Sequence, residues 1–202
     1  MSVITILDYI GVLVFAMSGV LAASDKKLDL FGGFIIAFVT ALGGGTLRDL
    51  FLNIDVGWIH HTNYIYIVIL GTVSALVFKK TLKKIRKTIF LFDTIGISLF
   101  TILGVQKALE FDTPLIVAVM FGVITATFGG VIRDILCNEI PLIFRKEIYA
   151  TACVIGGICY VSLFTLQINE NINLIISGLV IIGIRTISVL KKYSLPILND
   201  KI

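Results

Sequence analysis

Apolar stretches long enough to cross a lipid bilayer follow one another along almost the entire sequence, and they limit the possible folds more than any other feature. A membrane-spanning helix needs about 17 to 25 mostly apolar residues. Hydrophobic residues make up 57% of the 202 residues and charged residues only 15%, which is too apolar for a soluble domain of this size. We therefore expect an all-α integral membrane protein that forms a single membrane domain over residues 1–202.

Seven transmembrane helices are predicted from these stretches and from the polar loops between them. The first stretch contains Asp8 and lacks a basic leader, so we expect a retained helix rather than a cleaved signal peptide. The predicted spans are residues 3–23, 30–52, 63–78, 88–109, 113–138, 147–166 and 171–190.

Basic residues in the loops predict the orientation of the chain. One face collects thirteen lysines and arginines, including the run from Lys79 to Lys87, whereas the other face carries Lys107 alone. The positive-inside rule then places the C-terminus in the cytoplasm and the N-terminus outside the cell membrane. The net charge of +4 therefore indicates topology and not a nucleic-acid partner. The run itself is either a topology anchor or a site for anionic membrane lipids.

The second half of the sequence matches the first without a gap, at the single offset that places Asp93 on Asp8. Chance agreement in apolar sequence would favour Leu, Ile and Val, but the matched residues are of scarcer types. Each unit, about 3–78 and about 88–166, holds three predicted spans, so the second copy must cross the membrane in the opposite direction and 171–190 is an added helix. Such inverted repeats place ion or substrate sites near the midplane. At this offset, which we call the repeat offset, Gly44 and Gly45 meet Gly129 and Gly130, Arg48 and Asp49 meet Arg133 and Asp134, and Tyr64 meets Tyr149.

Two glycine-rich motifs inside the second and fifth spans are the strongest functional signal. The first is Gly43, Gly44 and Gly45 followed by Arg48 and Asp49; the second is Gly129 and Gly130 followed by Arg133 and Asp134. Each glycine costs a helix about 1 kcal/mol relative to Ala, so we expect a kink or a locally open turn whose carbonyls line a water-filled path. Close packing of helices on small residues is the alternative.

The charged residues within the spans predict two symmetry-related ion pairs, Asp8 with Arg48 and Asp93 with Arg133. Helical rise places each aspartate at a depth similar to that of its arginine. A charge inside a bilayer is costly and normally has a partner. The alternatives are that each arginine extends to its interface, or that it pairs locally with Asp49 or Asp134.

No residue pattern points to an enzyme, a metal site or a cofactor. His60 and His61 are adjacent loop residues without further ligand-type neighbours at metal spacing. Cys137, Cys153 and Cys159 lie in or beside apolar stretches and are expected to be reduced packing residues.

The paired glycine and Arg-Asp motifs resemble those of prokaryotic members of the trimeric intracellular cation (TRIC) channel family, over nearly the whole chain. The resemblance implies a homotrimer in which each protomer holds its own pore for K⁺ or other monovalent cations. It also implies that the glycines of the motifs are kink residues and that Arg48, Asp49, Arg133 and Asp134 lie near the pore. Phe128 stands where the first motif has Gly43, which predicts a milder second kink. The Lys-Glu motif of animal members is absent, so their lipid regulation is not implied.

A similar group of bacterial membrane proteins is associated with glycine uptake, so a small amino-acid transporter is the alternative function. A transporter would use Arg48 or Arg133 to hold a carboxylate, and its flux would saturate with substrate. A channel would pass ions in proportion to the driving force, with the four aspartates of the spans offsetting the arginines. An apolar narrowing at Phe38 or Phe121 could then gate the path by excluding water. A purely structural protein fits poorly with charges retained symmetrically in the bundle.

Overall fold

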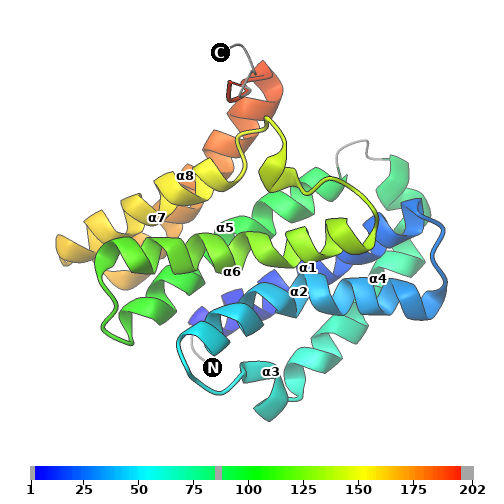
Figure 1. The fold of residues 1–202 in the computed structure, drawn as a ribbon, viewed down its shortest axis with the longest axis horizontal. Helices are drawn as coiled ribbons and strands as arrows, with labels where there is room; N and C mark the ends of the chain where they lie inside the picture. The colour runs from blue at the N-terminus through cyan, green and yellow to red at the C-terminus, as the bar shows by residue number, and fades with distance from the viewer. Residues whose placement is uncertain (1–2, 85–87, 197–202) are drawn as a thin grey trace, which may run out of the picture.

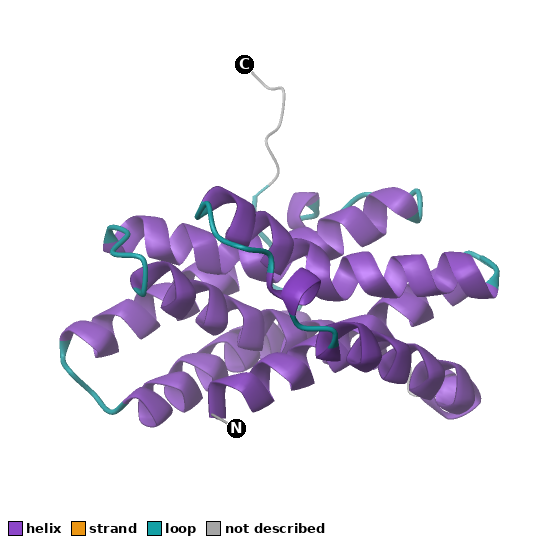
Figure 2. Ribbon diagram, turned by 90° about the horizontal axis from the view of Figure 1, so that it is seen from below, coloured by secondary structure: helices purple, strands orange, loops and turns teal. Residues whose placement is uncertain are grey.

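The computed structural model describes residues 3–84 and 88–196, and the described chain is almost entirely helical (Figure 1). Figure 2 shows that the helices are joined by short loops. Two short helices, α3 (Gly57–His60) and η1 (Leu142–Phe144), lie in the loops that follow α2 and α6. The long helices are α1 (Val3–Asp25), α2 (Leu30–Phe51), α4 (Asn63–Lys84), α5 (Thr88–Leu109), α6 (Leu115–Leu136), α7 (Ala150–Thr165) and α8 (Glu170–Lys191).

The long helices follow the predicted apolar stretches closely. Within the described residues, five of them are long and apolar enough to cross a membrane, while α7 and the apolar part of α4, Asn63–Phe78, are shorter. α4 continues beyond residue 78, and the side chains of the basic run from Lys79 to Lys87 lie outside the described part of the chain. α7 begins at Ala150 rather than at 147, because Glu147 forms an isolated β-bridge with Ser194.

Four helices, α1, α2, α5 and α6, form the centre of the molecule. α1 packs against α2 and α5, and α6 packs against α2 and α5. α4 covers α1 on one side, whereas α7 and α8 cover α5 on the other (Figure 1). The two halves of the chain therefore meet along the α1–α5 and α2–α6 contacts.

Helices α2 and α6 end in the same way. Asn53 and Asn138, which the repeat offset matches, follow α2 and α6 with φ angles of 56° and 55°. This left-handed conformation ends a helix, and asparagine adopts it more readily than most residues because its short polar side chain can form local hydrogen bonds. Equivalent sequence thus produces equivalent chain reversals after α2 and α6.

The glycine motifs bring the backbones of α2 and α6 into direct contact. A Cβ atom added to Gly44 would lie 2.1 Å from the carbonyl oxygen of Thr125, and one added to Gly129 would lie 2.2 Å from that of Thr40. Both helices remain α-helical through their glycines, so the predicted open turn is not formed in this conformation. At these two positions the glycines instead allow close packing of the two helices, which was the alternative to an open turn.

Candidate functional site

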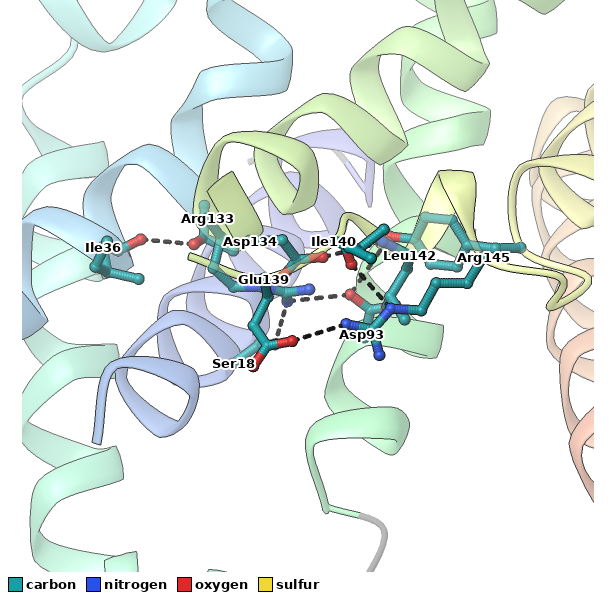
Figure 3. Close-up of polar contacts among 11 residues, drawn as sticks. Ser18, Ile36, Asp93, Arg133, Asp134, Glu139, Ile140, Leu142 and Arg145 are labelled. Atoms are coloured by element: carbon teal, nitrogen blue, oxygen red, sulfur yellow. Dashed lines mark hydrogen bonds and ion pairs between the residues drawn. The ribbon is translucent and has the colours of Figure 1, made fainter. Parts of the chain in front are cut away.

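The most deeply buried polar group of the two motifs surrounds Arg133, and we call Ser18, Asp93, Arg133, Asp134 and Tyr149 the Arg133 cluster. Figure 3 labels Ser18, Asp93, Arg133 and Asp134 of this cluster. Arg133 Nη1 lies 3.3 Å from Asp93 Oδ1 and donates to Ser18 Oγ at 3.0 Å. Its Nε donates to Asp134 Oδ1 at 2.8 Å. The Tyr149 hydroxyl donates to Asp93 Oδ1 at 3.4 Å. Arg133 and Asp93 are only 3% and 1% exposed, so the pair is desolvated.

The matching group near the other end of the core consists of Asp8, Arg48, Asp49 and Tyr64, which we call the Arg48 cluster. Arg48 donates from Nε and Nη2 to Asp49 Oδ1 at 2.8 and 2.7 Å. Asp8 accepts a hydrogen bond from the Tyr64 hydroxyl. Arg48 is partly exposed, in contrast to Arg133.

Of the two predicted ion pairs, one is confirmed and one is wrong. Asp93 pairs with Arg133, but within the described chain Asp8 and Arg48 form no direct ion pair. Arg48 instead pairs with the next residue, Asp49, which is the local alternative. Depth alone could not distinguish these outcomes, because two side chains at one depth can point in different directions around their helices.

Both motif aspartates also hold the loop that follows their helix. The second oxygen of Asp49 accepts the backbone N–H of Gly57 at 3.2 Å, at the start of α3. The second oxygen of Asp134 accepts that of Leu142 at 3.1 Å, at the start of η1. Gly57 and Leu142 again occupy positions that the repeat offset matches. Each Arg-Asp pair therefore ties its helix end to the following short helix.

A small cavity of ≈ 50 Å³ adjoins the Arg48 cluster. Its wall includes Asp8, Arg48 and Tyr64, and on the side of the second half Phe100 and Thr125. The single tryptophan, Trp58 of α3, also lines it and donates from Nε1 to Thr46 Oγ1 at 3.0 Å. This cavity beside α3 therefore gives access to the polar groups of the Arg48 cluster.

The two aromatic residues predicted as a gate do not line this cavity. Phe38 packs its ring against Trp58 with centroids 5.1 Å apart, and Phe121 packs against the apolar core. Phe15 and Phe100 form the aromatic pair between the two halves, with centroids 5.1 Å apart. The repeat offset matches these two residues, so each is the counterpart of the other.

Comparison with known proteins identifies the family of this chain. The family model described as "Glycine transporter" matches the chain twice, over residues 5–80 and 90–165. A solved TRIC cation channel, studied for the basis of its conductance, is 35% identical over 100% of both chains with a TM-score of 0.89. The TRIC orthologue from Rhodobacter sphaeroides is 31% identical over 96% of this chain and 100% of that one, with a TM-score of 0.91. The chain belongs to the TRIC family.

Bacterial relatives of this TRIC family member are membrane proteins. A UPF0126 membrane protein of Vibrio cholerae is 43% identical over 159 residues, which cover 78% of this chain and 66% of that protein. The UPF0126 inner membrane protein YadS of Escherichia coli K12 is 39% identical over 160 residues, covering 78% of this chain and 77% of that one. The matched proteins are channels or membrane proteins rather than enzymes, and the chain is an all-α membrane protein.

Sequence reasoning missed several residues of this TRIC family site. Tyr64 and Tyr149 were matched by the repeat but received no role, and Ser18 received none either. Arg185 in α8 was also missed, although it is 1% exposed. A lone arginine within a long apolar stretch was the available signal, because a charge at that position requires buried partners.

Proposed function

We propose that this protein is a cation channel that conducts K⁺ and other monovalent cations along a path within each protomer, and that it assembles as a homotrimer. The path runs between α1, α2, α5 and α6, from the Arg48 cluster to the Arg133 cluster. The observation that carries this proposal is the pair of carboxylate–arginine–tyrosine clusters on the two halves of one helical core. The relatives of known structure described as TRIC cation channels, one of them as a trimeric channel, support it.

The proposed topology has seven spans, made of two inverted three-helix repeats, about 3–78 and about 88–166, and the added helix at about 171–190. The N-terminus lies outside and the C-terminus in the cytoplasm. The double match of the family model supports the repeat. So do the reciprocal contacts of Gly44 with Thr125 and of Gly129 with Thr40.

In this proposal cations enter through the cavity beside the Arg48 cluster. Asp8 and Asp49 offer two carboxylates there against the single guanidinium of Arg48, which leaves an excess of negative charge for a cation. The route is closed where Gly44 and Gly129 hold α2 and α6 together. Conduction therefore requires the two helices to bend apart, with Gly43, Gly44, Gly45, Gly129 and Gly130 as the kink residues.

Glycine transport is the second candidate, because the matching family model is described by that activity. A transporter would need a guanidinium free to hold the substrate carboxylate. Arg48 already uses Nε and Nη2 on Asp49, and Arg133 is shared among Asp93, Asp134 and Ser18. Because both guanidinium groups are already bound to protein side chains, the channel is favoured over the transporter.

The decisive experiment is a recording of single-channel currents from the purified protein in a planar bilayer with asymmetric KCl. We expect discrete currents that reverse near the K⁺ potential and that change in Arg133→Ala and in the double variant Gly129→Leu/Gly130→Leu. Liposomes containing the same preparation are tested for uptake of labelled glycine. Silent bilayers together with saturable glycine uptake would replace the channel with a transporter.

A further inference from the structure

Arg185 is the largest fully buried side chain of the described residues, and it belongs to α8, outside both repeat units. Its guanidinium lies 5.0 Å from the ring centroid of Phe90 and 4.9 Å from that of Tyr149. Nη1 donates to the carbonyl oxygen of Ile148 at 2.9 Å and lies 3.6 Å from a carboxylate oxygen of Glu147. Among the described residues its Nε has no hydrogen-bond partner. Two aromatic faces and one carbonyl thus hold a buried cation in place.

This cation lies beside the Arg133 cluster. Tyr149, whose ring it covers, is the residue whose hydroxyl reaches Asp93. Tyr149 therefore contacts both the guanidinium of Arg185 and the carboxylate of Asp93. Glu147, its only acidic partner at ion-pair distance among the described residues, keeps 45% of its side chain exposed and is therefore largely screened by solvent. The charge of Arg185 is consequently felt in the interior, toward Asp93.

In the described part of the chain, the Arg48 cluster has no such cation. The ring of Tyr64, the counterpart of Tyr149, packs instead against the uncharged ring of Tyr9 in a T-shaped arrangement, with centroids 5.4 Å apart. Asp8, Arg48 and Asp49 line one cavity, which gives two negative charges against one positive. Asp93 and Asp134 pair with Arg133 in the same ratio, but Arg185, which lies over Tyr149, adds a second positive charge. With Glu147 left out of the count because its side chain is 45% exposed, the two clusters differ in formal charge by one unit.

We propose that Arg185 is a selectivity-determining residue that makes the two ends of the conduction path electrostatically unequal. The inference rests on the proposed channel function. The Arg48 end has a net negative charge and concentrates cations, whereas the Arg133 end is neutral and does not. Single channels should then pass unequal currents at equal positive and negative voltages, because cations reach the two ends at different local concentrations.

The test compares single-channel current–voltage curves of the wild type, Arg185→Gln and Arg185→Lys in symmetric KCl, together with reversal potentials in asymmetric KCl. We expect Arg185→Gln to remove most of the rectification and to raise the K⁺/Cl⁻ permeability ratio by roughly fivefold, since one buried unit charge is removed. Arg185→Lys keeps the charge and should keep the rectification. Equal curves for the wild type and Arg185→Gln, or a lysine variant that behaves like the glutamine variant, would overturn the proposal.

A matched control and a mirror-image variant complete the design. Arg145→Gln removes an arginine whose side chain is 40% exposed, from the loop between α6 and α7, and should leave the curve unchanged. Tyr9→Arg places a cation beside the ring of Tyr64 and should also reduce rectification, which keeps the test open if Arg185→Gln does not fold. An unchanged curve for a folded Tyr9→Arg channel would count against the charge argument. A silent wild-type protein would instead reject the channel function itself.

Discussion

The Arg48 and Arg133 clusters share four matched residues, yet one cluster is partly exposed beside a cavity and the other is sealed. Ser18 of α1 supplies Arg133 with a partner across the two halves, whereas the matched position of the second half is Leu103, which cannot donate or accept a side-chain hydrogen bond. Arg133 also reaches Asp93, whereas Arg48 pairs with Asp49. Duplicated sequence therefore provides the polar groups twice, and a few unmatched neighbours decide how tightly each group is closed.

The glycine contact between α2 and α6 should show the largest effect and should be the same in both halves. Gly44→Ala and Gly129→Ala each place a Cβ on a backbone carbonyl that cannot move without displacing its helix. We expect each substitution to destabilise the fold by about 3 kcal/mol or more, and to abolish channel currents. Thermal unfolding in detergent and bilayer recordings measure the two effects.

Gly33→Ala is the matched control for this prediction. It lies in α2 like Gly44, but a Cβ at this position would meet nothing within 4 Å. We expect it to be neutral or slightly stabilising, because alanine favours the helix. A tolerated Gly129→Ala beside a disruptive Gly44→Ala would mean that the two contacts are not equivalent.

The two arginines should differ in their contribution to stability. Arg133→Ala leaves Asp93 buried without its ion-pair partner, and we expect a loss of about 3 to 5 kcal/mol. Arg48→Ala leaves the buried Asp49 with the N–H of Gly57 as a remaining partner beside a cavity, so the expected loss is smaller, about 1 to 3 kcal/mol. Unfolding temperatures of the two variants, measured side by side in one detergent, check the order. Equal losses would show that the Arg48 cluster is as closed as its counterpart.

Ser18→Ala should have a smaller effect that is confined to the Arg133 cluster. It removes one hydrogen bond to a charged donor, for which we expect a loss of about 1.5 kcal/mol. Ser162→Ala is the control, because its exposed hydroxyl donates to the carbonyl of Ile158 in its own helix. The comparison of unfolding temperatures fails to support our account if the two serine variants behave alike.

The smallest effect concerns the surface pair of Lys26 and Glu139, whose matched positions in the other half carry Phe111 and Ile54. Lys26 Nζ donates to Glu139 Oε1 at 2.6 Å, and this contact holds the pKa of the Glu139 carboxyl below its usual value. A lowered pKa stabilises the fold above the unfolded value of about 4.3, and the gain is lost as pH falls through the lower folded value. Glu139→Gln should therefore lower the unfolding temperature slightly at neutral pH and not in acid. The difference in unfolding temperature between wild type and Glu139→Gln should also shrink in high salt. A difference that stays constant at all pH values would contradict this prediction.

Much of the fold followed from the sequence because the bilayer allows few alternatives. Apolar length located the helices to within a few residues at most ends, and the repeat offset identified positions that have matching contacts, such as Asp49 with Gly57 and Asp134 with Leu142. The short helices α3 and η1 were missed, because each is a single short turn that is held by an aspartate of the preceding helix.

By itself, the sequence determined that this is a membrane protein, where its long helices lie and which residue types are present in its two polar clusters. Apolar length and a gapless repeat are properties of the chain alone. Only the tertiary structure decided that Arg133 meets Asp93 while Arg48 meets Asp49, and that Arg185 of α8 lies over Tyr149. The physical reason is that partner choice depends on how each helix is rotated about its axis and packed against its neighbours, and these are set by contacts between segments that are far apart in the chain.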